Sequence, residues 1–422
     1  MKKVRIYLSI LSVFVISFSA LRAEKLFIPM DLAQTDHLKA YGIAYWVLKK
    51  GQSVDWLLNY RGGSFMADYS AQTASECRIR GVFFERIDEA SATRILAEVQ
   101  DENVNMDVVK LEKPPRIAVY APPGAQPWDD AVRLALDYAE IEHEIIWDEE
   151  VLGGKLDKYD WLHLHHEDFT GQYGKFWVSF QNAPWYIEQV ALNEGMAHKL
   201  GFNKVSKMKK AVVSIIKEYV ANGGFLFAMC SATDSFDITL ASMNLDICGP
   251  MFDGDPADPD ANNKLDFSKT FAFENFKLIM NPNIYEFSNI DITPNNTHNP
   301  DIDYFTLFEF SAKYDPVPTM LTQSHANVIE GFMGQTSAFR KEVIKKSVII
   351  MAERDGTDEV RYIHGNFGRG TFSWFSGHDP EDYKHHVGEQ PSEIRLFKNS
   401  PGYRLILNNV LFPAAKKKKQ KT

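Results

Sequence analysis

Clustered cations are scarce in this chain. Its formal net charge is −10, and the dense basic run consists of lysines 416–419 near the C-terminus. Because binding to phosphate backbones requires clustered lysine and arginine, we predict that nucleic acid is not a partner. Lysine runs at a chain end are typically solvated, so residues 413–422 are predicted to form a basic tail.

The apolar run near the N-terminus is too short to span a bilayer. It covers residues 6–18, whereas a transmembrane helix needs about 20 apolar residues. Three basic residues precede it, and Ala20 or Ala23 could sit at a cleavage point, which is typical of a secretory signal. We therefore predict that residues 1–23 are a signal peptide and that the mature protein is exported, periplasmic or extracellular, without a stable membrane span. A membrane anchor is the alternative.

Cysteine is also scarce, with Cys77, Cys230 and Cys248 as the three examples. An odd number in an oxidising compartment allows one disulfide and one free thiol. If Cys230 is catalytic, the consistent arrangements are a bridge between Cys77 and Cys248 or no bridge at all. The alternative is that all three are buried small apolar side chains.

The rest of the composition is that of a globular protein, with 45% apolar and 24% charged residues. A chain of 422 residues exceeds the usual size of one core, which favours a large domain and a smaller one. Lys113-Pro114-Pro115 marks a joint, because prolines favour an extended link. Residues 24–112 are predicted to be an N-terminal α/β segment, either a separate domain or extra strands of one sheet. Residues 113–412 are predicted to form the main domain.

Strands and helices alternate along the main domain. This pattern predicts the α/β class, with a mostly parallel, flavodoxin-like, doubly wound sheet. A glycine-rich turn between 359–364 and 371–376 predicts a hairpin. Residues 249–303 are rich in Asp, Asn and Pro and are predicted to be a solvated insertion or lid. Expected strands cover 116–120, 143–147, 159–166 and 225–230, and expected helices cover 129–139, 204–222 and 402–412.

A candidate nucleophile stands where one of these strands ends. The apolar run 225–230 stops at Cys230 and small residues follow it. A strand that turns sharply into a helix lifts its last side chain above the sheet edge, where it can reach a substrate. The backbone N–H of Ser231 and its neighbours could then stabilise an oxyanion. The alternative is that Cys230 is a buried structural thiol.

A cysteine nucleophile needs a base and a group that orients the base. His378 follows the late strand and is the candidate base, with Asp379 or Glu381 as the candidate orienting group. The alternative is that His378 is a turn residue with local hydrogen bonds.

A second polar cluster, His165, His166, Glu167 and Asp168, lies at the end of the strand at 159–166. These side chains could meet the late strand at the same sheet edge, because ligands of such sheets lie beyond the carboxyl ends of the strands. Imidazole and carboxylate suit zinc or manganese, so the cluster is a candidate substrate edge or metal site. The alternative is a hydrogen-bonded polar edge without a metal.

The Gly-Gly-strand-Cys230 elbow and the late Gly377-His378 resemble the class I glutamine amidotransferase-like superfamily over roughly residues 113–412. Within it, the run 365–372 followed by Gly377-His378-Asp379 is similar to the ThuA-like (trehalose-utilisation) branch. The N-terminal runs 27–32, 35–42 and 56–63 resemble an exported bacterial family often labelled asparagine synthetase B. The N-terminal nucleophilic cysteine and the pyrophosphate loop of such a synthetase are absent from this chain.

Three functions follow as hypotheses. The first is an exported, cysteine-dependent amide hydrolase or transferase for a small-molecule or glycan substrate, with Cys230 as nucleophile and no cofactor. The second is a non-catalytic or sugar-related ThuA-like binding protein, in which aromatic side chains such as Trp128, Trp177 and Trp185 would hold the ligand. The third is a metal-dependent hydrolase, with His165, His166, Glu167 and His378 around the ion.

Overall fold

The computed structural model describes residues 24–124, 130–292, 302–332, 334–382, 387 and 390–416. The predicted signal peptide, Trp128 and most of the basic tail lie outside this range. Among the described residues, no helix combines the length and the apolar character needed to cross a membrane.

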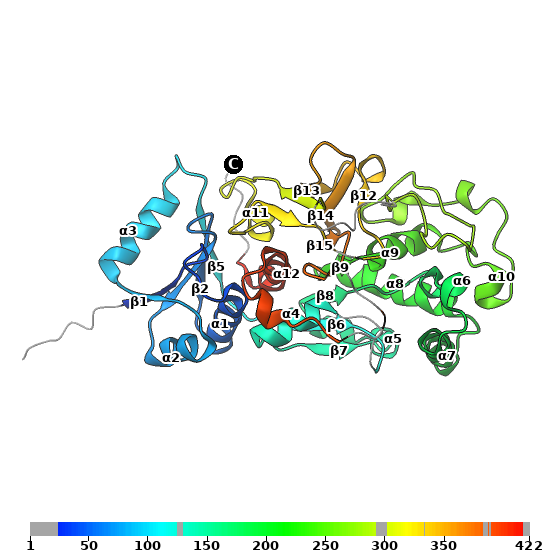
Figure 1. Ribbon diagram of the computed structural model, residues 1–422, viewed down its shortest axis with the longest axis horizontal. Helices are drawn as coiled ribbons and strands as arrows, with labels where there is room; N and C mark the ends of the chain where they lie inside the picture. Colours follow the sequence, from blue (N-terminus) through cyan, green and yellow to red (C-terminus); the bar gives the residue numbers. More distant parts are fainter. Residues whose placement is uncertain are drawn as a thin grey trace, which may run out of the picture.

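Residues 24–111 contain a sheet of their own at one end of the molecule, coloured blue to cyan in Figure 1. Its five strands lie in the order β4-β1-β3-β2-β5, and every neighbouring pair is antiparallel. The N-terminal segment is therefore not an extension of the main sheet. The strands are β1 (Glu24–Ile28), β2 (Val54–Leu58), β3 (Ser64–Asp68), β4 (Glu85–Asp88) and β5 (Asp107–Leu111), and the helices are α1 (His37–Lys49), α2 (Ala71–Arg80) and α3 (Glu89–Gln100).

Side-chain caps set the starts of these helices. Asp36 accepts the N–H of Lys39 at the start of α1, and Ser70 accepts the N–H of Thr73 at the start of α2. Such caps satisfy N–H groups that have no partner within the helix. Gly81, with a φ of 73°, ends α2 in the left-handed conformation that glycine adopts without strain.

The main domain contains a mixed sheet of ten strands. Five of them, in the order β7-β6-β8-β9-β15, are parallel to one another. The other strands, on the far side of β15, pair antiparallel. The strands are β6 (Ile117–Tyr120), β7 (Glu144–Ile146), β8 (Trp161–Leu164), β9 (Phe225–Met229), β10 (Tyr304–Leu307), β11 (Val328–Glu330), β12 (Phe339–Arg340), β13 (Ile349–Glu353), β14 (Glu359–Phe367) and β15 (Gly370–Phe375).

The α/β class is confirmed, but only part of the main sheet is parallel, namely strands β7, β6, β8, β9 and β15. The departure begins at the predicted hairpin, where Gly368 and Arg369 connect β14 directly to β15. A two-residue turn can join only antiparallel strands, whereas a parallel pair needs a long crossover. In the sheet, β14 and the strands beyond it, which all precede β15 in the chain, therefore pair antiparallel.

Helices cover both faces of the main sheet. On one face α4 and α12 pack against each other and against α1 of the N-terminal domain; Figure 1 shows α12, in red, between the two sheets. On the other face α8 packs between α5 and α9. The helices are α4 (Ala131–Ala139), α5 (Asp148–Leu152), α6 (Trp177–Phe180), α7 (Pro184–Lys199), α8 (Val205–Ala221), α9 (Ser231–Ala241), α10 (Pro250–Asp253), α11 (Pro316–Leu321) and α12 (Pro401–Leu411).

The predicted insertion is less solvated than its composition suggests. Its described part, 249–292 and 302–303, contributes Phe271, Phe273 and Ile290 to the core beneath α9. The buried carboxylate of Asp237 in α9 accepts the N–H groups of Phe271, Ala272 and Phe273 at 2.6–2.9 Å. Bonds from a carboxylate to main-chain N–H groups are stronger than neutral ones, so Asp237 fixes the segment to the domain.

Candidate functional site

The predicted elbow at Cys230 is present. Cys230 lies between β9 and α9 with a φ of 52° and a ψ of −139°, a backbone conformation that L-residues rarely adopt. Its N–H donates to the carbonyl of Phe375, and its carbonyl accepts the N–H and the hydroxyl of Thr233. Backbone strain of this kind typically costs about 1–3 kcal/mol and is concentrated at functional sites.

The thiol of Cys230 sits among backbone N–H groups. The N–H of Gln335 points at Sγ from 3.1 Å, and the N–H groups of Ser231 and Thr336 also favour the thiolate. Burial opposes them and is the larger effect, because it removes water from the charged form. It raises the pKa of Cys230 to about 12, so the resting thiol is neutral at physiological pH.

Cys230 opens onto a cavity of about 290 Å³. His378 lines the same cavity, and Gly334 lies beside both side chains. A Cβ on Gly334 would lie 3.0 Å from both Cys230 Sγ and His378 Cδ2, so glycine leaves the space between them open. The other lining residues are His166, Lys175, Phe176, Ser179, Phe180, Tyr285 and Gln335.

The polar cluster after β8 reaches the same place as His378. The imidazole rings of His165 and His378 lie 4.7 Å apart between centroids, and those of His165 and His166 lie 4.0 Å apart. One nitrogen from each of the three rings falls within 4.8 Å of the others. These three histidines, which we call the histidine cluster, could hold one metal ion.

Helix α9 positions residues 165–169, which we call the histidine loop, through three hydroxyl groups. Ser231 donates to the carbonyl of His166 at 2.9 Å, and Ser235 donates to the carbonyl of Glu167 at 3.0 Å. Thr239 continues the row with a 2.8 Å bond to the carbonyl of Phe169. Because residues four apart share one helix face, the sequence after Cys230 places the histidine loop beside the thiol.

The two carboxylates of that loop face other partners. Asp168 accepts the N–H groups of Thr170, Gln172 and Gly174 at 2.6–3.0 Å, which shapes the loop after it. Burial and the neighbouring Asp148 raise the pKa of Glu167 to about 7, although Lys209 opposes this shift. Among the described residues, neither Glu167 nor Asp168 belongs to the group that could share an ion with the histidine cluster.

The two acids after His378 have hydrogen-bond partners of their own. Asp379 is buried and accepts the N–H groups of Glu381 and Asp382 at 3.3 and 3.2 Å. Glu381 bonds to the side chain of Ser400 at the start of α12, and burial raises the pKa of Glu381 to about 7. A role for either acid in orienting His378 stays a prediction.

All three cysteines are buried free thiols, so the predicted alternative of a bridge between Cys77 and Cys248 is wrong. Cys77 lies in the core of the N-terminal domain, whereas Cys248 contacts the carbonyl of Thr170 in the main domain.

Of the aromatics predicted for ligand binding, Trp185 packs against Phe176 and Phe180 of the cavity wall. Trp177 begins α6.

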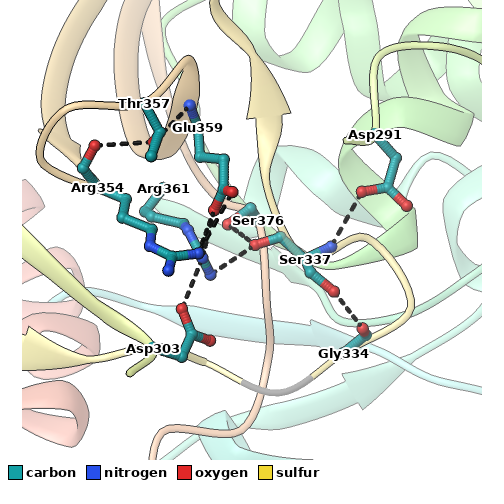
Figure 2. A network of polar contacts seen from close by, with 9 residues as sticks. All are labelled: Asp291, Asp303, Gly334, Ser337, Arg354, Thr357, Glu359, Arg361 and Ser376. Carbon is teal, nitrogen blue, oxygen red and sulfur yellow. Dashed lines mark hydrogen bonds and ion pairs between the residues drawn. The ribbon is translucent and has the colours of Figure 1, made fainter. Parts of the chain in front are cut away.

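Sequence patterns did not reveal the 334–337 loop, which approaches Cys230 from outside the parallel strands. Figure 2 shows how Ser337 anchors this loop. The carbonyl of Ser337 accepts bonds from Arg361 at 2.9 Å and from Ser376 at 2.8 Å, and its hydroxyl donates to the carbonyl of Gly334. Arg361 is in turn paired with the buried Asp303 at 2.6 Å. A buried ionic network therefore holds the loop that carries the N–H groups beside Cys230.

The same loop depends on Asp291, which predicts a pH effect on stability. Asp291 accepts the N–H of Ser337, and burial raises the pKa of Asp291 to about 8 from an ordinary value near 3.8. The folded state therefore keeps a proton that the unfolded state loses. The stabilisation is complete below about pH 4 and disappears as the pH rises through about 8, at a rate of up to about 1.4 kcal/mol per unit. Urea unfolding should show a flatter dependence over this range for Asp291→Asn; an unchanged slope would contradict the prediction.

No protein-family model matches the chain, and no curated protein matches it. Among solved structures, two cytoplasmic proteins from Salmonella typhimurium are 12% and 11% identical, each with a TM-score of 0.37. They cover 72% and 71% of this chain and 100% and 99% of their own. An exo-β-1,4-mannosidase from Opitutaceae bacterium strain TAV5 is 11% identical over 62% of this chain and 31% of its own, with a TM-score of 0.26. Likenesses this distant bear on neither activity nor substrate.

Proposed function

We propose that the cavity is the active site of a cysteine-dependent hydrolase or acyltransferase acting on the amide or ester carbonyl of a small molecule. The observation that carries this proposal is the strained elbow, which presents Cys230 to a cavity that it shares with His378. Strained backbone, a thiol and a base in one cavity are the components of covalent acyl transfer.

In this reaction His378 takes the Sγ–H proton while Sγ attacks the carbonyl carbon. This order suits a thiol whose raised pKa keeps it neutral at rest. The N–H groups around Cys230 would stabilise the developing oxyanion. The amine or alcohol then leaves with the proton from His378, and a thioester remains on Cys230. Water, deprotonated by His378, cleaves the thioester to a carboxylic acid; an amine acceptor would complete a transfer instead.

The strand order supports the finer assignment to a flavodoxin-like, doubly wound domain. Numbered along the chain, the parallel strands β7-β6-β8-β9-β15 follow the order 2-1-3-4-5, and Cys230 lies at a carboxyl end, where such sheets bind ligands. Together with the resemblance of residues 113–412 to the amidotransferase-like superfamily, this supports an enzyme of amide chemistry.

Trapping the acyl-enzyme tests the proposal. The mature protein is mixed with p-nitrophenyl acetate, and its mass and peptides are then analysed. We expect one acetyl group on Cys230, and none at this position in Cys230→Ser. His378→Gln should also lose this acetylation, and His198→Gln, at an exposed histidine in α7, is the matched control for that variant. Acetylation confined to lysines, unchanged in Cys230→Ser, would contradict the proposal.

A metal-dependent hydrolase is a second candidate, favoured by the histidine cluster. Three imidazoles with a cavity beside them match the ligand set of catalytic zinc, which would supply a bound hydroxide as nucleophile. We expect metal-free protein to bind one Zn²⁺ or Co²⁺ per chain. His166→Ala should weaken binding at least about 100-fold, because loss of even an outer-shell partner typically costs 10–100-fold. Titration followed by the visible spectrum of Co²⁺ measures this; equal binding by wild type and His166→Ala would exclude the site.

A further inference from the structure

Lys175 lies in the wall of the Cys230 cavity and is 3% exposed. Its ammonium group donates to the main-chain carbonyls of Ile279 and Glu286, both at 2.8 Å. Among the described residues, no carboxylate lies within ion-pair distance of this ammonium group. Two carbonyls occupy two of its three N–H donors, which leaves one for the cavity.

Burial of a cation without an ionic partner is unfavourable. Desolvation lowers the pKa of Lys175 to about 8, although Glu286, Asp168 and Asp234 oppose this shift. A flexible lysine could avoid the cost by extending into water. Lys175 does not, so the surrounding structure must hold it in place.

The backbone around Lys175 accounts for that restraint. Tyr173, Gly174 and Lys175 have φ values of 53°, 70° and 55°, three successive left-handed residues of which two carry a Cβ. This conformation is unfavourable for a residue with a Cβ, because the Cβ approaches the following carbonyl oxygen. Asp168 stabilises the run by accepting the N–H of Gly174. Strain maintained by dedicated contacts is typical of binding and catalytic sites.

Gln335 connects this strained run to the thiol. Its N–H points at Cys230 Sγ from 3.1 Å, while its side-chain amide donates to the carbonyls of Gly174 at 2.9 Å and Tyr285 at 3.2 Å. One residue therefore fixes the position of Lys175 relative to Cys230. The remaining described wall is aromatic or neutral, apart from the imidazoles of His166 and His378, and includes no carboxylate.

We propose that Lys175 binds a carboxylate of the substrate, so that the molecules processed at Cys230 are small acyl compounds carrying a second, anionic group. The reacting site rests on the proposed function, whereas the anion site does not. The carboxylate would complete the ionic pairing of Lys175, and Gln335 would fix the distance between the anion and the reacting carbonyl. A neutral analogue of the same shape would leave the buried ammonium unpaired and would bind weakly.

Propionate and propionamide, which differ in charge but little in shape, test this inference. Saturation-transfer NMR at constant ionic strength measures binding to wild type, Lys175→Met and Lys210→Met. Lys210 is the matched control, since it is a partly buried lysine that donates to a carbonyl and lies outside the cavity lining. We expect saturable propionate binding to wild type and Lys210→Met, at least about tenfold weaker binding to Lys175→Met, and no competition by propionamide. Equal binding to Lys175→Met, or no saturable binding to wild type, would overturn the proposal.

Alkylation provides a second measurement at Cys230 itself. Iodoacetate carries the carboxylate that iodoacetamide lacks, so the ratio of their rates should fall at least about tenfold in Lys175→Met. An unchanged ratio would overturn the proposed orientation. Propionate binding without acylation of Cys230 would refute the proposed reaction and leave the anion site standing, so the two failures can be told apart.

Discussion

Replacing Gly42 by alanine should destabilise the protein more than a typical surface substitution, because it inserts a methyl group between two helices. Gly42 lies in α1, and a Cβ at this position would meet the carbonyl oxygen of Ala139 in α4 at 1.9 Å. The backbone would have to shift, since the clashing atom is not a side chain. We expect a loss of at least about 1–3 kcal/mol in the free energy of unfolding.

Gly195→Ala is the matched control for this prediction. Gly195 lies within α7, and a Cβ there would meet no atom within 4 Å. Alanine is favoured over glycine inside a helix by roughly 0.5–1 kcal/mol, so this variant should be stabilised. Urea unfolding of both variants measures the difference. Equal stability would mean that α1 of the N-terminal domain does not pack closely on α4.

Arg361→Met should lower stability by about 3–5 kcal/mol, since it leaves a buried charge without its partner. Arg361 is 2% exposed and pairs with Asp303, which is 1% exposed, and with Glu359 at 2.9 Å, and it also donates to the carbonyl of Ser337. We also expect faster hydrogen exchange at the N–H of Gln335, because Ser337 anchors the loop that carries it. Denaturant titration and exchange measured by NMR test both effects.

Arg354→Met is the control for the ionic network. Arg354 approaches Glu359 at 3.4 Å and is more exposed, at 24% of its side chain, so its loss should cost less than about 1 kcal/mol. If Arg361→Met and Arg354→Met had equal effects, the network in Figure 2 would not support the loop beside Cys230.

The sequence predicted the core of the candidate site because its signals are local. A helix, a glycine pair and an apolar run indicated β9 and the turn at Cys230, and a glycine-rich turn indicated β14 and β15. Strand β3 and helix α2 were missed. Residues 71–80 in α2 are polar and bury only Thr73, Ala74 and Cys77, so their apolar pattern is weak.

The rest of the site depends on contacts between distant segments, which periodicity does not encode. Gln335 reaches Cys230 across 105 residues of sequence, and Lys175 reaches the cavity through a left-handed run that no local motif announced. Asp168 shows the same limit. The sequence places it after two histidines, but its bonds to the main-chain N–H groups of its own loop became visible only in the structure.

The central claim is that His378 activates Cys230, and the rate at which iodoacetamide alkylates Cys230 between pH 6 and 10 tests it most directly. Mass spectrometry of the folded mature protein gives this rate for wild type, His378→Gln and the control His198→Gln. We predict that at neutral pH His378→Gln reacts about 100-fold more slowly than wild type, as expected for loss of a general base, and that His198→Gln is unchanged. If wild type and His378→Gln instead react at the same rate, rising only as the pH nears the thiol pKa of about 12, His378 does not activate Cys230.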